Sequence, residues 1–172
     1  MALEIVNLDD NLEEKFWEHV NQDPLDYFFF ILDWKFDRDR SEIFLALEEN
    51  EIKGLMLIFN KSIVQIRGDY EAARILLDHL DMKEVEMNAP EELEDLMLEK
   101  YEPKISNQIV LMYLRKGEEN IQKSHEPLRL SEEDAEGIAG LMRTSYPDWW
   151  GDTTAERIRN HMKRSFWLGM KH

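Results

Sequence analysis

The sequence predicts a mixed α/β (α+β) fold, in which a mostly antiparallel sheet carries helices on both faces and an incomplete second copy follows. Three apolar runs in close succession carry this prediction; they occupy residues 43–47, 52–59 and 63–66 and are separated by short polar breaks. Runs and breaks of this length favour antiparallel hairpins. Because the first two runs are apolar on both sides, the sheet should be covered on both faces.

Segments that could form covering helices precede these runs. A short strand at residues 3–8 leads, through a capping Asp or Asn, into a first helix with a buried stripe of Phe16, Trp17 and Val20. A second helix at residues 25–36 is apolar nearly all round, which predicts burial from more than one side. The charged stretch that follows it, RDR after an Asp, favours a solvated turn with local ion pairs over an anion clamp.

Further elements extend the sheet beyond the three runs. Gly54, inside the second run, indicates a bulge or a close backbone approach. Helical spacing at 70–80 and 91–101 alternates with predicted strands at 83–88 and 108–114. Together these elements define a first domain at residues 1–116, and the polar residues 117–124 are predicted to form a linker.

The order of the opening elements recurs from residue 125 onward. A strand and a capping box lead into a helix striped by Ile138, Leu141 and Met142, and a second helix and an apolar segment at 165–170 follow. Matching elements are about 122 residues apart, which indicates an internal repeat. Residues 125–172 are therefore predicted to be the strand-helix-helix-strand start of a second domain.

Composition and charge exclude several classes of site. The chain has no cysteine, which excludes disulfides, thiolate zinc sites and cysteine nucleophiles and favours a reducing, cytoplasmic location. Its formal net charge of -16 opposes binding to nucleic acid and to anionic membranes. The five histidines are scattered without metal-ligand spacing, so no metal site is predicted.

Two stretches resemble the GNAT superfamily of N-acetyltransferases. EIFLALEENEIKGLMLIF at residues 42–59 is similar to that family's strand, acidic turn, I-x-G and second strand, with Ile52 and Gly54 in the matching places. EPLRLSEEDAEGIAGLM at residues 126–142 is similar to the family's customary opening. The order of elements is similar as well. The whole chain resembles a two-copy archaeal-type protein with a divergent first copy and the start of a second.

The resemblance implies acetyl-CoA as the cofactor, held by a glycine-containing loop that follows the fourth strand and opens a helix. The matching residues are 65–71, with Arg67 and Gly68 as the predicted cofactor-binding residues. Tyr70 and Glu71 replace the later small residues of the loop, and the acids on either side of Tyr70 would repel phosphate. The resemblance therefore implies a degenerate loop here, while the loop of the second copy would fall beyond the end of this chain.

Three aromatic residues are predicted to lie near an acceptor substrate. Tyr146, Trp149 and Trp150 stand between the two helices of the second copy, where the resemblance implies the acceptor groove. The alternative is that the tryptophans pin these helices against the sheet. No catalytic residue is assigned, and the Gly-x-Ser-x-Gly signature of serine hydrolases is absent from the sequence.

The sequence thus predicts the N-terminal portion of a GNAT-like N-acetyltransferase. In the full-length protein an amine, small molecule or peptide, would attack acetyl-CoA directly, helped by a general base and by backbone donors to the oxyanion. The present chain is expected to be non-catalytic. The alternative is a non-enzymatic binding or dimerisation module with the same fold, forming a homodimer through the unpaired strand edge of the incomplete second copy.

Overall fold

The computed structural model describes residues 2–118 and 126–170. The chain divides into two compact units, residues 1–108 and residues 109–172. The sequence predicts that the first domain ends at residue 116, because residues 108–114 are predicted to form its last strand. Most of the predicted linker at 117–124 lies outside the described residues.

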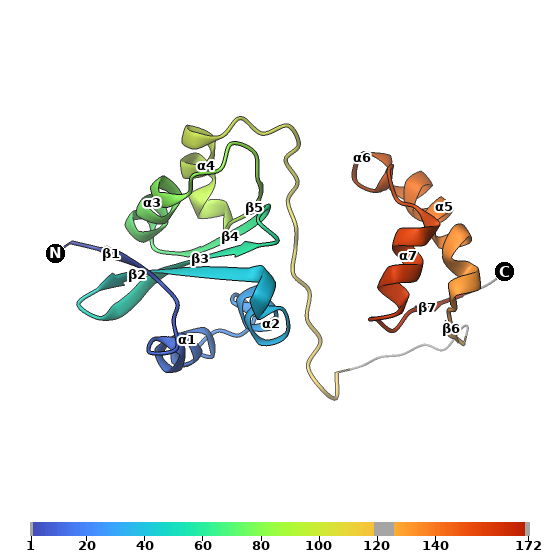
Figure 1. Cartoon of the computed structure of the whole chain (residues 1–172), viewed down its shortest axis with the longest axis horizontal. Helices are drawn as coiled ribbons and strands as arrows, with labels where there is room; N and C mark the ends of the chain where they lie inside the picture. The colour runs from blue at the N-terminus through green and yellow to red at the C-terminus, as the bar shows by residue number, and fades with distance from the viewer. Residues whose placement is uncertain (1, 119–125, 171–172) are drawn as a thin grey trace. The chain divides into compact units, whose positions relative to one another are not determined.

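The first unit contains a five-stranded sheet in the order β1-β2-β3-β4-β5 (Figure 1). Neighbours among the first four strands are antiparallel, and β5 lies parallel to β4. This confirms the predicted mixed, mostly antiparallel sheet. The strands are β1 (Glu4–Asn7), β2 (Ser41–Glu48), β3 (Glu51–Phe59), β4 (Ile63–Gly68) and β5 (Glu86–Asn88).

The polar breaks of the sequence form the hairpin turns of the sheet. Glu49 and Asn50, with φ of 49° and 71°, join β2 to β3. Asn60 and Lys61, with φ of 52° and 57°, begin the turn from β3 to β4. Two successive residues with positive φ suit the right-handed twist of the flanking strands. The register of all three strands is therefore set locally.

Gly54 in β3 lies against Gly68 at the end of β4. A Cβ atom on Gly68 would lie 2.4 Å from the Gly54 Cα and 2.4 Å from the Lys53 carbonyl oxygen. Gly68 also has a φ of 131°, which a residue with a side chain rarely adopts. The β2–β3 register shifts between Ala46 and Leu47, beside Gly54. The bulge and the close backbone approach predicted at Gly54 are both confirmed.

Two pairs of helices cover the two faces of the sheet (Figure 1). On one face lie α1 (Glu13–Val20) and α2 (Phe28–Phe36). On the other face lie α3 (Tyr70–His79) and α4 (Glu94–Lys100), the latter entered through the 3-10 turn η2 (Glu91–Leu93). The two faces have separate cores, as the predicted double coverage requires. Fully buried side chains include Phe16, Phe30, Leu45, Leu55 and Leu57 on the α1–α2 face and Met56, Val64, Ile66 and Leu76 on the other.

The sequence predicts that the helix at residues 25–36 is buried from more than one side. This prediction is wrong. Phe30 and Trp34 of α2 are 0 % and 7 % exposed and face the sheet. Phe28, Phe29 and Phe36 are 40 %, 41 % and 69 % exposed. The apolar pattern cannot tell which side of a helix will meet the sheet, because that depends on what packs there.

The charged stretch after α2 forms the short 3-10 turn η1 (Arg38–Arg40). Arg38 pairs with Asp10 at 2.8 Å and with Glu13 at 3.1 Å. Arg40 pairs with Asp37 at 3.0 Å. The solvated turn with local ion pairs predicted for these residues is confirmed.

Residues 108–114 do not form the strand that the sequence predicts. They have no strand structure, and the six apolar side chains at 109–114 are 53–87 % exposed. An apolar run becomes a strand only where a neighbouring strand accepts its backbone hydrogen bonds. The pattern of the run carries no information about such a neighbour.

The second unit has the same order of strand, helices and strand as the opening of the first. Strand β6 (Leu128–Arg129) pairs antiparallel with β7 (Leu168–Gly169). Between them lie η3 (Glu132–Asp134), α5 (Ala135–Ser145), α6 (Pro147–Trp150) and α7 (Ala155–Met162). The predicted capping box is present, since the Ser131 N–H donates to the Asp134 carboxylate at 2.8 Å. Leu141 of the predicted buried stripe is instead 67 % exposed.

Within the described residues, no helix is both long enough and apolar enough to cross a membrane.

Candidate functional site

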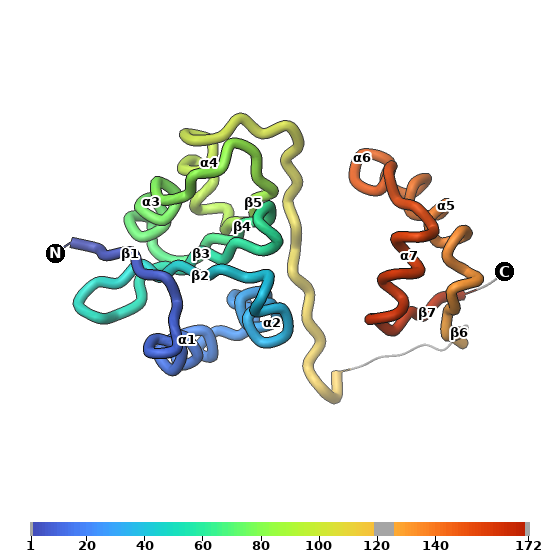
Figure 2. The backbone as a smooth tube through the Cα atoms, in the orientation of Figure 1, coloured from blue at the N-terminus to red at the C-terminus, as the bar shows by residue number. Residues whose placement is uncertain are grey.

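A hollow of about 700 Å³ lies where the parallel strands β4 and β5 stop pairing. The last paired residues are Gln65 and Asn88, and the chain then turns from β4 into α3 and from β5 towards η2 (Figure 2). In sheets with parallel strands, ligands bind beyond the carboxyl ends of the strands. The hollow is therefore the candidate site. Its lining comprises Asp26 and Tyr27 before α2, Arg67 to Tyr70 from the end of β4 to the start of α3, and Pro90, Glu92 and Leu93 after β5.

Arg67, a predicted cofactor-binding residue, lines this hollow but is held by the protein itself. Its Nε donates to the Asp26 carboxylate at 2.8 Å, and its Nη2 donates to the Asn88 side-chain oxygen at 3.3 Å. Its Nη1 donates to the Ile66 carbonyl at 2.8 Å, and only 12 % of the side chain is exposed. The guanidinium thus ties the ends of β4 and β5 to the segment before α2.

Gly68, the second predicted cofactor-binding residue, also lines the hollow. Its missing side chain is explained by packing, because an added Cβ atom would overlap the backbone of β3 at Lys53 and Gly54. A glycine that lets a phosphate approach would instead face open space at the start of the helix. The structure therefore gives Gly68 a role in joining β4 to β3, and its role towards a cofactor stays a prediction.

The start of α3 is the position where a phosphate-binding loop would present free N–H groups. Here the Asp69 carboxylate accepts from the Ala72 N–H at 2.9 Å, so the helix is capped by its own side chain. The Asp69 N–H donates to the Lys53 carbonyl, and the Ala73 N–H donates to the Asp69 carbonyl. Glu71 adds a second negative charge in the first turn. A carboxylate at this place repels a pyrophosphate and replaces it as the acceptor. These residues do not fit the diphosphate of acetyl-CoA.

Tyr27 forms one wall of the hollow and contacts His19 of α1. The His19 Nε2 and the Tyr27 hydroxyl oxygen are 3.0 Å apart, and the two rings meet edge to face. Burial lowers the pKa of His19, which keeps the imidazole neutral at neutral pH. Burial, with Asp26 nearby, raises the pKa of Tyr27, while Arg67 opposes this shift. The Tyr27 hydroxyl therefore stays protonated, and its hydrogen bond goes to His19, with the donor set by the imidazole tautomer.

The polar group that surrounds Arg67 was missed by the sequence analysis. Gln65 of β4 is 5 % exposed, and its side-chain oxygen has no hydrogen-bond partner among the described residues. Asn88 pairs in register with Gln65, and Asp26 comes from a segment 41 residues away from Arg67. One signal was available: polar residues at alternate positions of an otherwise apolar strand indicate a polar neighbour on that face.

The predicted acceptor-groove residues belong to the second unit, and none of them is among the residues that line the hollow of the first unit. Tyr146 and Trp149 stack with their ring centroids 6.5 Å apart and are 42 % and 39 % exposed. Trp150 is half-buried at the end of α6. The stacked pair is accessible rather than sealed against the sheet, and its role in a substrate groove stays a prediction.

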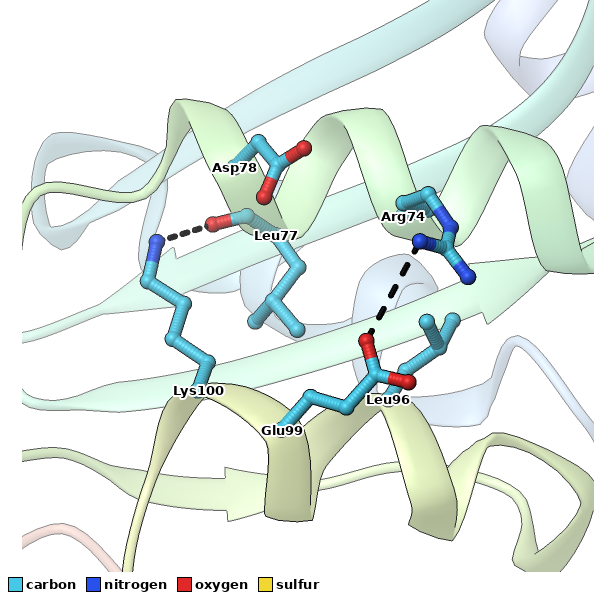
Figure 3. Close-up of a pocket in the computed structure, with 6 residues that line it drawn as sticks. All are labelled: Arg74, Leu77, Asp78, Leu96, Glu99 and Lys100. Atoms are coloured by element: carbon cyan, nitrogen blue, oxygen red, sulfur yellow. Dashed lines mark hydrogen bonds and ion pairs between the residues drawn. The ribbon is translucent and has the colours of Figure 1, made fainter.

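A second, smaller hollow of about 300 Å³ lies between α3 and α4 (Figure 3). Its charged side chains are engaged in holding the two helices together. The Lys100 ammonium donates to the carbonyls of Leu77 and Leu80 at the end of α3, and Arg74 faces Glu99 at 4.0 Å. A lysine at the carboxyl end of a helix stabilises that helix through its dipole. This hollow is therefore part of the packing of α4 on α3.

No group of three or more potential metal ligands occurs among the described residues. This statement covers His, Cys, Asp and Glu side chains in residues 2–118 and 126–170.

Comparison with known proteins found no matching family model and no matching curated protein. Solved structures do match. A ribosomal-protein-alanine N-acetyltransferase from Brucella melitensis biovar Abortus 2308 has 16% identity and a TM-score of 0.45, over 65% of this chain and 100% of that chain. An aminoglycoside acetyltransferase from an uncultured soil metagenomic sample, in complex with sisomicin, has 18% identity and a TM-score of 0.42, over 66% and 95%. Its complex with trehalose has 19% identity and a TM-score of 0.39 over the same shares.

At these identities and TM-scores, the assignment of the fold rests on the strands themselves. The first unit has a strand, two helices, an antiparallel meander, a helix, a parallel strand and a helix, with helices on both faces. This is the order of elements that the sequence resemblance to the GNAT superfamily implies, without its final strand at residues 108–114.

Proposed function

We propose that this chain is the N-terminal portion of a GNAT-like N-acetyltransferase, and that its first unit is a non-catalytic copy of the fold. In the full-length protein the reaction would move an acetyl group from acetyl-CoA to an amine, at the second copy. The first unit would act as its structural partner. The fold and the repeated order of strand, helices and strand in the second unit support this proposal.

One observation carries the non-catalytic role of the first unit. The Asp69 carboxylate occupies the start of α3 and accepts from the Ala72 N–H. Arg67, the one Lys or Arg side chain among the described residues that line the hollow, already pairs with Asp26. A diphosphate placed here would meet the negative charges of Asp26, Asp69 and Glu92 at a helix start that Asp69 already caps. Since the residues do not fit the cofactor, no catalytic step is assigned to the first unit.

Calorimetric titration of the chain with acetyl-CoA tests this proposal. We expect no binding at micromolar concentrations, and micromolar binding to the unchanged chain would contradict it. Asp69→Gly removes both the charge and the cap, and Asp69→Asn removes the charge but keeps a capping side chain. Asp78→Asn, on the exposed side of the same helix, makes the same charge change and serves as the control. Any gain in acetyl-CoA binding should be largest for Asp69→Gly, smaller for Asp69→Asn and absent for the control.

The alternative is a non-enzymatic binding or dimerisation module. It is favoured by the two-stranded ribbon of the second unit, where Phe166, Leu168 and Met170 are 65 %, 53 % and 60 % exposed. Light scattering separates the two functions, because a dimer that is lost on Phe166→Ser and Leu168→Ser would support the module. A monomer at all concentrations would count against it.

A further inference from the structure

The outer side of α2 carries a continuous row of large apolar side chains. Leu25, Phe28, Phe29 and Phe36 are 41 %, 40 %, 41 % and 69 % exposed, and Leu32 between them is half-buried. We call these five residues the α2 strip. Phe28, Phe29, Leu32 and Phe36 share one side of the helix, because three or four residues separate Phe28 and Phe29 from Leu32 and Leu32 from Phe36. Leu25 lies in the turn that precedes the helix. The opposite side carries Phe30 and Trp34, which are buried against the sheet.

The α2 strip is long enough to accept another helix. The helix α2 has nine residues, or about 13 Å at 1.5 Å per residue, which is about two and a half helical turns. Phe28 and Phe29 meet edge to face with centroids 5.3 Å apart, so the strip contains an aromatic pair. Within α2, Phe29, Leu32 and Phe36 have the i, i+3 and i+7 spacing of the anchors by which amphipathic helices bind one another. Isolated exposed apolar residues need no such explanation, but a row of five does.

Asp33 adds a charge to one edge of the α2 strip. It follows Leu32 directly and lies one turn after Phe29, so its carboxylate borders the apolar row. Among the described residues, no hydrogen bond or ion pair involves this carboxylate. Burial and the neighbouring Asp37 raise its pKa to about 6, while Arg40 opposes the shift. A half-buried carboxylate of this kind is stabilised when a cation approaches it.

The negative charge of the first unit favours a positively charged partner. Residues 1–108 contain 27 acidic and 11 basic side chains, which accounts for the whole formal net charge of -16. Two copies of this unit meeting through their α2 strips would bring like charges together. An anionic membrane is disfavoured for the same reason. A cationic partner is favoured by both the net charge and Asp33.

We propose that the α2 strip docks a cationic amphipathic helix, whose apolar side covers Phe28, Phe29 and Phe36 and whose Lys or Arg pairs with Asp33. This surface lies on the outer side of the helix and does not depend on acetyl transfer. Lys35, on the other edge of the strip, lies over the Phe36 ring at 5.4 Å and limits the cationic contact to the Asp33 edge.

Fluorescence anisotropy with an 18-residue Leu/Lys peptide, designed as a helix with all its leucines on one side, tests the proposal. The full chain should bind the labelled peptide, and the same peptide with Glu for Lys should not bind. Phe29→Ser combined with Phe36→Ser should weaken binding at least about tenfold, since both rings would be buried against the peptide. Met112→Ser, which removes a more exposed apolar side chain in the other unit, should change binding less than about twofold.

Asp33→Asn and its control separate a specific contact from general attraction. Asp33→Asn should weaken binding by about two- to fivefold, the range of a single partly exposed ion pair. Asp39→Asn changes the net charge equally, at an exposed residue of η1 outside α2, and should leave the affinity nearly unchanged. Equal losses for these two variants would show attraction by net charge alone and would overturn the proposal. The proposal would also be overturned if the unchanged chain did not bind the peptide. A dimer of the chain that dissociates when the α2 strip is substituted would overturn it as well.

Discussion

The two units begin with the same order of elements, yet they bury very different side chains. The opening of the first unit buries Phe16 and Phe30 completely, against β2 and β3. The matching helices of the second unit bury Ala135, Ala139, Ala155 and Ile158. Its strands β6 and β7 pair over two residues, whereas β1 and β2 pair over four. A strand-helix-helix-strand segment obtains a large core only where the sheet continues beyond it.

The largest expected effect tests the core of the first unit. Phe16→Ala should lower the free energy of unfolding of this unit by about 3–5 kcal/mol, because it removes a fully buried aromatic side chain. Hydrogen exchange followed by mass spectrometry should show the loss of protection in β2, β3 and β4. Phe36→Ala, at a side chain that is 69 % exposed, is the control and should cost less than about 0.5 kcal/mol. Equal effects of the two substitutions would contradict the assigned core.

A smaller effect is expected in the core of the second unit. Ile158→Ala should cost about 2–3 kcal/mol, near the low end for such a truncation, since its cluster consists of alanines and of side chains that are only partly buried. Hydrogen exchange should speed up in α5 and α7 while the peptides of β2 to β4 remain protected. Simultaneous loss of protection in both units would show that the two cores unfold as one and would remove the distinction between them.

Gly68 in the first unit and Gly137 in the second allow the backbones of the two units to be compared. Gly68→Ala should destabilise the first unit by about 1–3 kcal/mol, because the residue has a φ of 131° and an added Cβ would overlap β3. Gly137, in α5 of the second unit, faces open space, so Gly137→Ala should stabilise that unit by about 0.5–1 kcal/mol. Urea unfolding of both variants measures whether each substitution raises or lowers the free energy of unfolding. A stabilising Gly68→Ala would show that β4 and β3 are not packed as described.

The smallest expected effect concerns Asp33 beside the α2 strip. Its pKa of about 6 in the folded chain exceeds the ordinary value of 3.8, so the folded state binds the proton more tightly than the unfolded state. The contribution of Asp33 to stability therefore falls as the pH rises from about 4 to about 6. Asp33→Asn should remove this dependence and stabilise the chain at neutral pH by up to about 1 kcal/mol, a figure discounted for the exposure of the side chain.

Urea unfolding of the Asp33→Asn chain and the unchanged chain, compared at about pH 4 and about pH 7, measures the effect. The difference between the two chains should be larger at the higher pH. Asp39→Asn makes the same change of charge and is the control. A difference that grows towards low pH would contradict the raised pKa.

Local features of the first unit were predicted well from the sequence. The hairpins joining β2, β3 and β4 depend on turn residues within four positions of one another, and the bulge and close approach at Gly54 followed from one glycine in an apolar run. The capping box at Ser131 depends on two residues three positions apart. In each case the interacting residues are close in the sequence, so the pattern contains the whole interaction.

The predictions that failed required information about distant partners. The strand expected at 108–114 lacks a neighbour to pair with, and Leu141 lies on the side of α5 that nothing covers. The polar group around Arg67 joins β4 to Asp26 and to Asn88, which are 41 and 21 residues away. The alternation of Gln65 and Arg67 indicates a polar side of β4, but not which distant residues meet it. The acids of the loop were visible in the sequence, but the capping bond of Asp69 needed the helix to be in place.

The sequence by itself determined the order of the elements, the hairpins, the charge of the first unit and the chemical conflict between Asp69 and a phosphate. These properties depend on residue types and on neighbours along the chain. Only the tertiary structure decided that one side of α2 is exposed, that Gly68 packs against β3, and that Arg67 is already engaged. Burial and ion pairing depend on which segments contact one another in the folded chain. Segments with similar apolar patterns have different neighbours in the two units.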